Sequence, residues 1–263
     1  MHEVLQLDGK VKKSIELPEV FNAEVNMPVI RRALLAEITH NLQPQGHDIL
    51  AGMKTTAAYY GAMSSYRTGR HMGIAIRPRE KLGGGVQGKV KRIPSAVKGK
   101  RAHPHVIEKR LVERINKKEY QSAIESALSY SKFGINSQKI KQAPIIFTDE
   151  IERISKTKEL VKVLKDNGLF GFIEASKKPK IREGLRRSAR VRHYKKSILF
   201  VFSKNASALK AARNLPGADA CDVSSLSVSK LVPGGSEKRI TIWSESAVNA
   251  IAAAIKEYNL HNK

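Results

Sequence analysis

The sequence predicts an α/β protein: a largely parallel sheet flanked by helices, with a long irregular basic loop inserted. In the second half of the chain, short apolar segments alternate with amphipathic ones, which favours parallel strands connected by helices. The segment Ile198–Phe202 is apolar at every position, as expected for a strand buried on both faces. Residues 51–105 carry no sustained apolar period, which is unusual inside a compact domain.

The first half of the chain begins with a predicted hairpin. The segments His2–Leu7 and Lys10–Leu17 flank Asp8-Gly9, a dipeptide that favours a two-residue turn between antiparallel strands. A helix is predicted to open at Pro28. Apolar residues recur in it every four positions, and we expect them to face the core: Ile30, Leu34, Ile38 and Leu42.

The remaining elements follow after the loop. Four further strands are predicted at Pro144–Phe147, Ile198–Phe202, Ala218–Val223 and Ile240–Trp243. Two helices are predicted before the first of them, at Val106–Lys117 and at Glu119–Lys132, the second with Ala123, Ala127 and Leu128 inward. Three more helices are predicted among the strands: one capped by Thr157 and ending at Gly168, one capped by Asn205 and ending at Arg213, and one starting at Ser244 or Ser246 with Val248, Ile251 and Ile255 inward.

The composition limits the class of protein. The 263 residues are 41% apolar, enough to build a core, so a wholly disordered chain is excluded. We expect residues 1–50 and 106–263 to form a globular α/β domain, and 51–105 to form an extended loop. The single cysteine, Cys221, excludes an internal disulfide and favours a reducing, cytoplasmic location; its position in a predicted strand indicates a buried, inert thiol. No apolar run approaches the length of a membrane helix, so no membrane partner is expected.

Positive charge is concentrated in two segments. The chain has 48 Lys and Arg against 24 Asp and Glu, a net charge of +24. Between residues 51 and 106, Glu80 is the only acid beside twelve basic residues: Lys54, Arg67, Arg70, Arg77, Arg79, Lys81, Lys89, Lys91, Arg92, Lys98, Lys100 and Arg101. Between residues 177 and 196, Glu183 is the only acid beside ten: Lys177, Lys178, Lys180, Arg182, Arg186, Arg187, Arg190, Arg192, Lys195 and Lys196.

This distribution favours a polyanionic partner. The two segments together hold 20 of the 24 excess charges, so the rest of the chain is nearly neutral. The first segment also holds nine of the 18 glycines, and glycine lets a backbone approach phosphates closely. Tyr59, Tyr60 and Tyr66 could stack on unpaired bases or pack at the base of the loop. No major-groove reading motif is present, and an irregular glycine-rich arm suits folded RNA better than a regular duplex.

Two nucleotide-binding patterns coincide in the loop. Gly83, Gly85 and Gly88 fit G-x-G-x-x-G, and with Lys89 they nearly fit the phosphate-binding P-loop, although Val90 replaces the hydroxyl that would bind magnesium. Both motifs need a buried strand before the loop and a helix after it. The flanking residues predict neither, so we interpret these glycines as a flexible tip.

Two other clusters have a chemical and a structural interpretation. His103 and His105 lack a third metal ligand at a suitable spacing, so backbone or phosphate hydrogen bonding is the preferred role. Asp149, Glu150 and Glu152 follow a predicted strand, where catalytic carboxylates often lie. They also suit the acid-rich first turn of a helix, and we prefer that interpretation because no base or nucleophile accompanies them.

Particular segments identify a resemblance. The chain resembles the large-subunit ribosomal protein L-four family, in its archaeal and eukaryotic branch. The matching segments are Glu16–Phe21, Met27–Ala33, Lys91–Pro104, Arg192–Ser203, Ala211–Ala220 and Trp243–Ala247, with Lys91–Pro104 and Arg213–Gly217 the most specific.

The resemblance implies a non-enzymatic protein of the cytoplasmic large ribosomal subunit that binds large-subunit ribosomal RNA early in assembly. Its loop would help to line the polypeptide exit tunnel. Neighbouring ribosomal proteins and, near the tip, the nascent polypeptide are the other implied partners; no cofactor, metal, membrane or small-molecule substrate is expected. The tunnel-tip candidates are Arg70, His71, Met72, Arg77, Gly83, Gly84 and Gly85.

The resemblance also assigns RNA contacts by position. In the loop these are Arg67, Arg70, Arg77, Arg79, Lys89, Lys91, Arg92, Lys98, Lys100, Arg101 and His103; on the globular domain they are Arg182, Arg186, Arg187, Arg190, Arg192, Lys195 and Lys196. The charge distribution adds Lys54 and Lys81 to the predicted RNA contacts of the loop. Two rival functions remain at this point. One is a nucleotide-dependent enzyme using the glycine loop and the Asp149 cluster, and the other is a chromatin-type DNA-binding protein, since charge alone does not distinguish polyanions.

Overall fold

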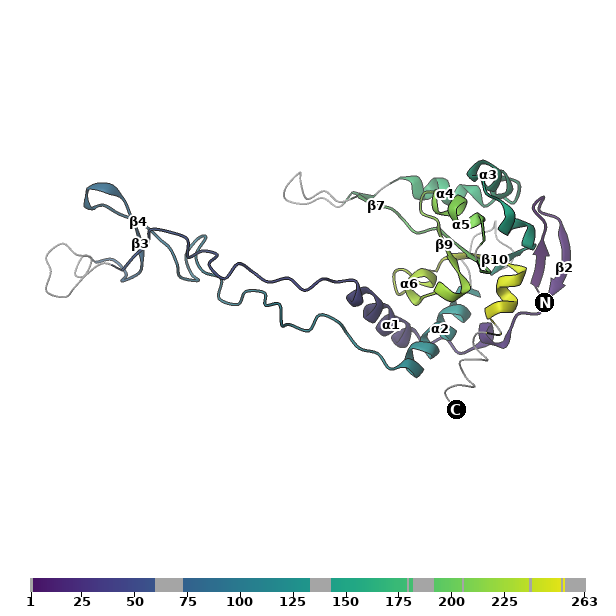
Figure 1. Ribbon diagram of the computed structural model, residues 1–263, viewed down its shortest axis with the longest axis horizontal. Coiled ribbons are helices and arrows are strands. Elements are labelled where there is room, and N and C mark those ends of the chain that lie inside the picture. Colours follow the sequence, from purple (N-terminus) through teal and green to yellow (C-terminus); the bar gives the residue numbers. More distant parts are fainter. Residues whose placement is uncertain are drawn as a thin grey trace. The chain divides into compact units, whose positions relative to one another are not determined.

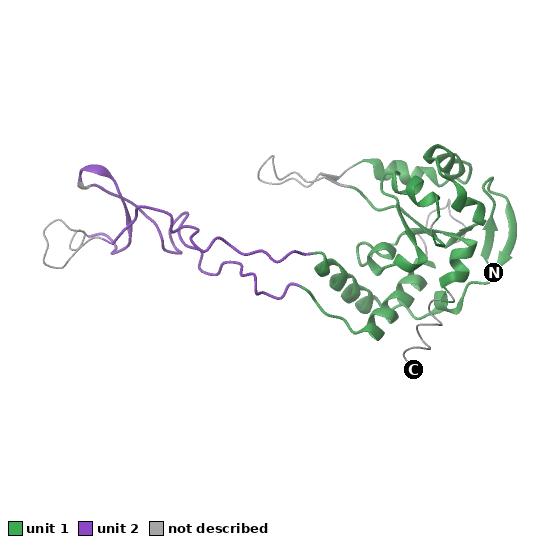
Figure 2. Ribbon diagram, in the orientation of Figure 1, with its two compact units in different colours: residues 1–41, 112–263 green, residues 42–111 purple. Residues whose placement is uncertain are grey.

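The computed structural model describes residues 2–59, 73–132, 143–178, 180–181, 192–204, 206–236, 238–251 and 253. The chain divides into two compact units (Figure 2). Unit 1 comprises Met1–Asn41 and Val112–Lys263, and unit 2 comprises Leu42–Leu111. The predicted loop of residues 51–105 falls within unit 2. Tyr60, Tyr66, Asn205 and Ile255 lie outside the described residues, so the predictions made for them are not tested.

Unit 1 is built on a six-stranded sheet in the order β2-β1-β5-β10-β8-β9 (Figure 1). Only β2 is antiparallel to its neighbour; every other pair of adjacent strands is parallel. The predicted α/β class is therefore confirmed. The strands are β1 (His2–Leu5), β2 (Val11–Ile15), β5 (Ile145–Phe147), β8 (Ile198–Phe202), β9 (Asp219–Asp222) and β10 (Ile240–Ser244).

Helices cover both faces of this sheet. One layer contains α3 (Thr157–Asp166), α4 (Phe170–Lys177) and α5 (Ala208–Arg213). The other contains α1 (Met27–His40), α2 (Lys117–Lys132), α6 (Val228–Leu231) and a helical segment at residues 245–251. Side chains alternate along each strand, so Phe200 and Phe202 pack in the first core and Leu199 and Val201 in the second. This double burial explains why β8 is apolar throughout.

Several predicted boundaries coincide with capping contacts. The expected hairpin of β1 and β2 forms, but its turn differs from the predicted two-residue one: Gly9, with φ +80°, donates its N–H to the Gln6 carbonyl, so Leu7 and Asp8 are the central residues of the turn. The Asn26 side chain accepts a hydrogen bond from the Val29 N–H and caps α1. The Ser244 hydroxyl accepts from the Ala247 N–H at the start of the last helical segment. Side-chain oxygens thus satisfy N–H groups that the first helical turn leaves free.

Three helix predictions were wrong. Thr157 does not cap α3 but is its first residue, and Lys156 occupies the N-cap position without a side-chain hydrogen bond. Residues 106–116 form no helix, and α2 begins at Lys117. Val106 and Ile107 are exposed, so this segment lacks the packing from which helices in proteins gain most of their stability. In α1, Ile30 and Leu34 are buried, but Ile38 is 47% exposed and Leu42, beyond the helix, is 49% exposed. Four-residue steps advance about 400° around a helix, so the stripe rotates away from the core.

The structure also contains elements that the sequence did not predict. Helix α4 follows Gly168, whose φ of +68° ends α3. Three short 3-10 helices lie at η1 (Glu19–Asn22), η3 (Asp149–Arg153) and η5 (Val223–Ser225). A further 3-10 turn, η2 (Gly83–Gly85), joins two short strands of unit 2.

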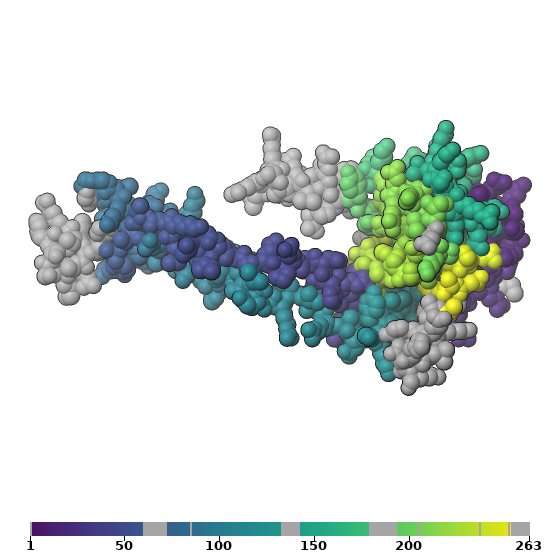
Figure 3. Space-filling view, viewed as in Figure 1, coloured from purple at the N-terminus to yellow at the C-terminus, as the bar shows by residue number. Residues whose placement is uncertain are grey.

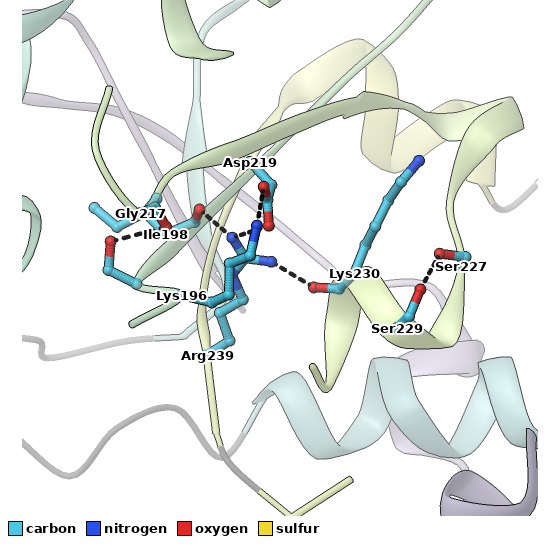
Figure 4. Close-up of polar contacts among 9 residues, drawn as sticks. Lys196, Ile198, Gly217, Asp219, Ser227, Ser229, Lys230 and Arg239 are labelled. Carbon is cyan, nitrogen blue, oxygen red and sulfur yellow. Dashed lines mark hydrogen bonds and ion pairs between the residues drawn. The ribbon is translucent and has the colours of Figure 1, made fainter. Parts of the chain in front are cut away.

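A buried arginine ties three parts of unit 1 together (Figure 4). Arg239, 2% exposed, lies 2.7 Å from the Asp219 carboxylate of β9. It donates hydrogen bonds to the carbonyls of Ile198 and Lys230, both at 2.8 Å. Burial lowers the pKa of Arg239, and the negative charge of the neighbouring Asp219 offsets part of this decrease. The guanidinium thus links β8, β9 and the end of α6.

Candidate nucleic-acid interface

Unit 2 contains a small sheet of its own. Strands β3 (Arg79–Lys81) and β4 (Gln87–Val90) pair antiparallel, and Ala58 forms a bridge to Arg79 with two hydrogen bonds of 3.1 Å. The Tyr59 hydroxyl donates to the Ile76 carbonyl at 2.7 Å. The two limbs of the loop, residues 42–59 and 73–111, are therefore held together by backbone contacts rather than left as independent coils.

Two glycines allow the limbs to approach each other closely. A Cβ on Gly52 would lie 2.2 Å from the Gly99 carbonyl oxygen, and a Cβ on Gly99 would lie 2.0 Å from the Ile93 carbonyl oxygen. No side chain can occupy either position without moving the backbone. At these two positions, glycine is needed because the backbone packs directly against another part of the backbone. Nearer the base of the loop, the His47 N–H donates to the His105 carbonyl at 3.0 Å.

The limb from residue 91 to residue 100 has an unusual backbone. Arg92 and Lys98 have φ of +68° and +56°, a conformation that non-glycine residues seldom adopt. The Arg92 guanidinium donates to the Thr55 carbonyl of the other limb at 3.1 Å. Two consecutive turns follow, closed by Ala96 N–H to Ile93 carbonyl and Gly99 N–H to Ala96 carbonyl hydrogen bonds. These contacts fix the path of the backbone that carries the basic side chains.

Unit 2 lacks an apolar core among its described residues. Ala57 is the one buried apolar residue there, at 1% exposure. Ile49 and Val97 are 88% and 82% exposed, and Figure 3 shows atoms of unit 2, in blue, at the surface of the face in view. A segment that buries so little apolar surface gains little stability from its own packing. It is suited to being covered by a partner.

The basic side chains of unit 2 fall into two groups. Some have partners inside the unit: Lys54 pairs with Asp48 at 2.7 Å, Arg79 donates to the Ala75 carbonyl, Lys91 donates to the Val97 carbonyl, Arg92 contacts Thr55, and Lys81 also has a contact. Seven others are exposed and have no side-chain ion-pair or hydrogen-bond partner among the described residues. Two of them, Lys109 and Arg110, lie beyond the predicted loop, and the five within residues 51–105 make up the second group: Arg77, Lys89, Lys98, Lys100 and Arg101. This second group is available to bind an external anion. We call it the free-cation group.

The second basic segment is described only at its ends. Four of its basic residues lie outside the described ones: Arg182, Arg186, Arg187 and Arg190. The same is true of four predicted site residues of the loop: Arg67, Arg70, His71 and Met72. The described ends pair as β6 (Lys180–Ile181) with β7 (Arg192–His193) in an antiparallel ribbon. Lys195 and Lys196 are exposed, and Lys196 donates to the Asp219 carboxylate at 2.7 Å. Half-burial alone would raise the pKa of Asp219, but Lys196 and Arg239 outweigh it and hold that pKa below its ordinary value.

The glycine pattern in unit 2 lies in a hairpin rather than in a phosphate-binding loop. Gly83 and Gly85 form the η2 turn between β3 and β4, and Gly88 lies within β4. Gly84 has φ +72°, and nothing approaches its Cβ position within 4 Å. A strand follows the loop where a nucleotide site would need a helix N-terminus. This arrangement does not fit the nucleotide-dependent enzyme.

The acidic cluster has a structural role. Glu152 of η3 accepts hydrogen bonds from the Ser203 N–H at 2.7 Å, the Ser203 hydroxyl at 2.6 Å and the Ser244 hydroxyl at 2.5 Å. Asp149 accepts from the N–H and hydroxyl of Ser246, both at 2.8 Å. The two carboxylates join the carboxyl ends of β5, β8 and β10. The structural interpretation of the cluster therefore fits these contacts, although its helix is a 3-10 helix.

We predict that Glu152→Ala lowers the free energy of unfolding by about 3 kcal/mol, because hydrogen bonds to a charged group contribute about 1.5–3 kcal/mol each and their donors would lose their acceptor. The measurement is urea unfolding followed by circular dichroism. Glu150→Ala is the matched control, because Glu150 is exposed and has no partner among the described residues; it should change stability by less than about 0.5 kcal/mol. Equal effects of the two variants would contradict this role for Glu152.

His103 and His105 are both exposed. Within the described residues, no group of three or more His, Cys, Asp or Glu side chains could hold a metal ion. Cys221 is buried, and burial raises the pKa of its thiol to about 11, as expected for an unreactive cysteine. No described helix is long and apolar enough to cross a membrane.

Comparison with known proteins gives a consistent result. The model of the ribosomal protein L4/L1 family matches residues 15–254. The large ribosomal subunit protein uL4 of Methanococcus aeolicus is 37% identical, over 95% of this chain and 97% of that protein. The uL4 proteins of Archaeoglobus fulgidus and Sulfurisphaera tokodaii are 36% and 37% identical; each match covers 94% of this chain, and 96% and 92% of the relatives. Proteins of this kind are structural rather than catalytic, and the resemblance predicted from the sequence is confirmed. The chain belongs to the ribosomal protein L4/L1 family.

Proposed function

We propose that this chain is a structural constituent of the large ribosomal subunit in the cytoplasm, and that it binds large-subunit ribosomal RNA early in assembly through unit 2. The observation that carries the proposal is the free-cation group: five exposed cations without partners among the described residues, on a backbone that buries almost no apolar surface. The L4/L1 family and the uL4 relatives support the ribosomal setting.

The chemistry of unit 2 suits the RNA backbone. The unit has fourteen basic and three acidic residues, so it attracts a polyanion along both limbs. Arg77 and Arg101 can each bind a phosphate through two parallel N–H groups, and the lysines act as point charges. Such contacts position a protein on nucleic acid and read little sequence. Exposed apolar side chains such as Ile49 and Val97 supply surface for neighbouring ribosomal proteins or unstacked bases.

The contribution to the exit tunnel is the finer part of this proposal. The β3–β4 turn consists of three glycines, Gly83, Gly84 and Gly85, and Arg77 lies shortly before β3. These residues are our candidates for contact with the nascent polypeptide, together with Arg70, His71 and Met72.

Equilibrium binding tests the proposal against its main rival. The full chain is titrated with large-subunit ribosomal RNA and with duplex DNA of equal length, from 50 mM to 500 mM salt. We expect tighter binding to RNA at every salt concentration, and a steep fall in affinity with salt, because neutralised phosphates release counterions. Equal affinity for the two nucleic acids would favour the DNA-binding alternative, and binding without salt dependence would contradict the proposed role of the cations.

A further inference from the structure

Unit 1 contains a cluster of three helices at the two points where unit 2 is attached to it. Helix α1 ends at His40, just before unit 2 begins, and α2 begins at Lys117, shortly after unit 2 ends. The two helices pack against each other, and both also contact the short helix α6 (Figure 1). Contacts between the end of α1 and the start of α2 can therefore hold both attachment points of the loop.

Glu37 makes the central contact of this cluster. It lies in the last turn of α1, is half-buried, and accepts a hydrogen bond from the Tyr120 hydroxyl of α2 at 2.6 Å. Its carboxylate also accepts from the N–H groups of Val228 and Ser229, at 2.8 Å and 2.9 Å. One side chain thus joins the end of α1 to the first turn of α2 and to the first turn of α6.

The contact with α6 is a cap that another helix supplies. The N–H groups in the first turn of a helix have no partner inside that helix. Ser227, at the N-cap of α6, makes no capping hydrogen bond with its side chain, and the Glu37 carboxylate takes its place. Val228 and Leu231 of α6 are buried in the second core. The cap therefore ties the end of α1 to that core.

Tyr120 is a stable donor to Glu37. Its ring is partly buried and packs against the second core. Burial, and after it the hydrogen bond to Glu37, raises the pKa of Tyr120 above its ordinary value of 10.0. The hydroxyl therefore keeps its proton at neutral pH, and the link between α1 and α2 is a permanent part of the fold.

A second contact joins α1 directly to the returning chain. Thr39 is buried; its hydroxyl donates to the Ala36 carbonyl at 3.0 Å and accepts from the Glu113 N–H at 3.1 Å. Glu113 lies four residues before α2, in a segment that forms no helix. Thr39 thus holds the backbone of an irregular segment against the last turn of α1. We call the contacts of Glu37, Thr39, Glu113 and Tyr120 the root clamp.

We propose that the root clamp orders the base of the loop before RNA binds, and that Glu37 and Thr39 are positioning residues for the binding reaction. This rests on the proposed RNA-binding function. Unit 2 buries little apolar surface, so it gains little order from its own packing. Attachment points that are already fixed within unit 1 remove part of the ordering entropy that binding would otherwise cost. The loop then binds more tightly without any additional phosphate contact.

The first test compares two variants with the same change of charge, Glu37→Gln and Glu152→Gln. In each, an amide group that cannot accept a hydrogen bond replaces one carboxylate oxygen. Glu152 is the matched control because it is also half-buried and also accepts from an N–H and from hydroxyls. Its donors Ser203 and Ser244 lie at the ends of β8 and β10, outside the root clamp. Binding of the full chain to large-subunit ribosomal RNA is measured over a salt series, together with thermal unfolding.

We expect Glu37→Gln to lower the affinity for RNA by about tenfold at every salt concentration, because only a fraction of the molecules then presents an ordered loop base. The salt slope should not change, since no phosphate contact is lost. Removing a negative charge alone would strengthen binding, so the control should bind at least as tightly as the unchanged chain. Both variants should unfold at a lower temperature than the unchanged chain, so a difference in RNA affinity between them does not follow from lost stability alone.

Three results would overturn the root clamp. One is a Glu37→Gln variant that binds RNA as tightly as the control, which leaves the proposed function intact. Another is a reduced salt slope in Glu37→Gln, because the residue would then act on phosphate contacts rather than on the order of the loop base. The third is an unchanged chain that fails to bind the RNA, which overturns the proposed function as well.

Tyr120→Phe and Thr39→Val test the clamp without changing any charge. Each removes one hydroxyl and keeps nearly the same shape, so these variants decide the proposal if Glu37→Gln does not fold. Tyr130→Phe is the control on the same helix, since the Tyr130 hydroxyl donates to the Ser236 carbonyl at 2.9 Å. We expect each clamp variant to lose about threefold in affinity at every salt concentration, and Tyr130→Phe to bind like the unchanged chain. Unchanged binding by both clamp variants would overturn the proposal.

Discussion

Replacing the free-cation group, Arg77, Lys89, Lys98, Lys100 and Arg101, with glutamine is expected to lower the affinity for large-subunit ribosomal RNA by about four orders of magnitude at 0.1 M salt. Each lost phosphate contact removes about 0.7–0.9 from the salt slope, which is nearly one order of magnitude per contact at a tenth of molar salt. These side chains have no partner among the described residues, so their removal breaks no contact that holds unit 2 together. Filter binding over a salt series measures both quantities.

The matched control removes the same charge from unit 1. Exposed lysines without ion-pair partners among the described residues are available for this: Lys10, Lys12, Lys118, Lys158 and Lys162. Their replacement by glutamine changes the net charge equally, and it should reduce the slope by less than about 1. If both variants lose the same affinity, the binding depends on net charge alone, and the assignment of the interface to unit 2 fails.

A second large effect on stability, as large as that of Glu152→Ala, is expected at Arg239. Arg239→Met should lower the free energy of unfolding by about 3 kcal/mol, because removing one partner of a buried ion pair costs about 3–5 kcal/mol and Asp219 keeps Lys196 as a partner. The carbonyls of Ile198 and Lys230 lose their donors as well. Thermal and urea unfolding measure the loss. Lys196→Gln is the control: its ion pair is half exposed at the lysine, so it should cost less than about 1 kcal/mol.

The same pair predicts how acid affects the fold. Because Lys196 and Arg239 hold the pKa of folded Asp219 below its ordinary value of 3.8, ionised Asp219 stabilises the folded state above that value. This stability is lost as the pH falls through the folded pKa. In Arg239→Met, the decrease in unfolding free energy below pH 4 should therefore be smaller than in the unchanged chain. An identical pH dependence in the two proteins would contradict the coupling between Arg239 and Asp219.

Local sequence predicted the parts of the fold that local interactions determine. The β8 strand follows from five successive apolar residues, and the hairpin of β1 and β2 follows from Asp8-Gly9. The family was identifiable from short segments of sequence such as Lys91–Pro104. The free-cation group lies within the first basic segment, because charge density is visible in sequence without knowledge of the fold.

Contacts between distant segments could not be predicted in this way. The Gly52–Gly99 approach joins residues on opposite limbs, and neither glycine carries a local signal beyond its type. Lys196 and Lys195 look equivalent in sequence, but only Lys196 meets Asp219, which lies on the neighbouring strand β9. The error at residues 106–116 has a related cause: the apolar residues suggested a helix, but Val106, Ile107 and Val112 are exposed and only Ile115 packs, partly buried, against a core.

The central claim is that the chain needs unit 2 to assemble into the large subunit. Deleting residues 53–103 tests this claim most directly. Both apolar cores lie in unit 1, so unit 1 should fold without the loop. The His47 N–H donates to the His105 carbonyl at 3.0 Å, so the two limbs that the deletion joins are in contact between the new junction and unit 1. The measurement is sedimentation with large subunits through a sucrose gradient in high salt. We predict that the full chain sediments with the subunits and that the folded deletion variant remains at the top of the gradient. A deletion variant that sediments with the subunits as fully as the intact chain would contradict the account.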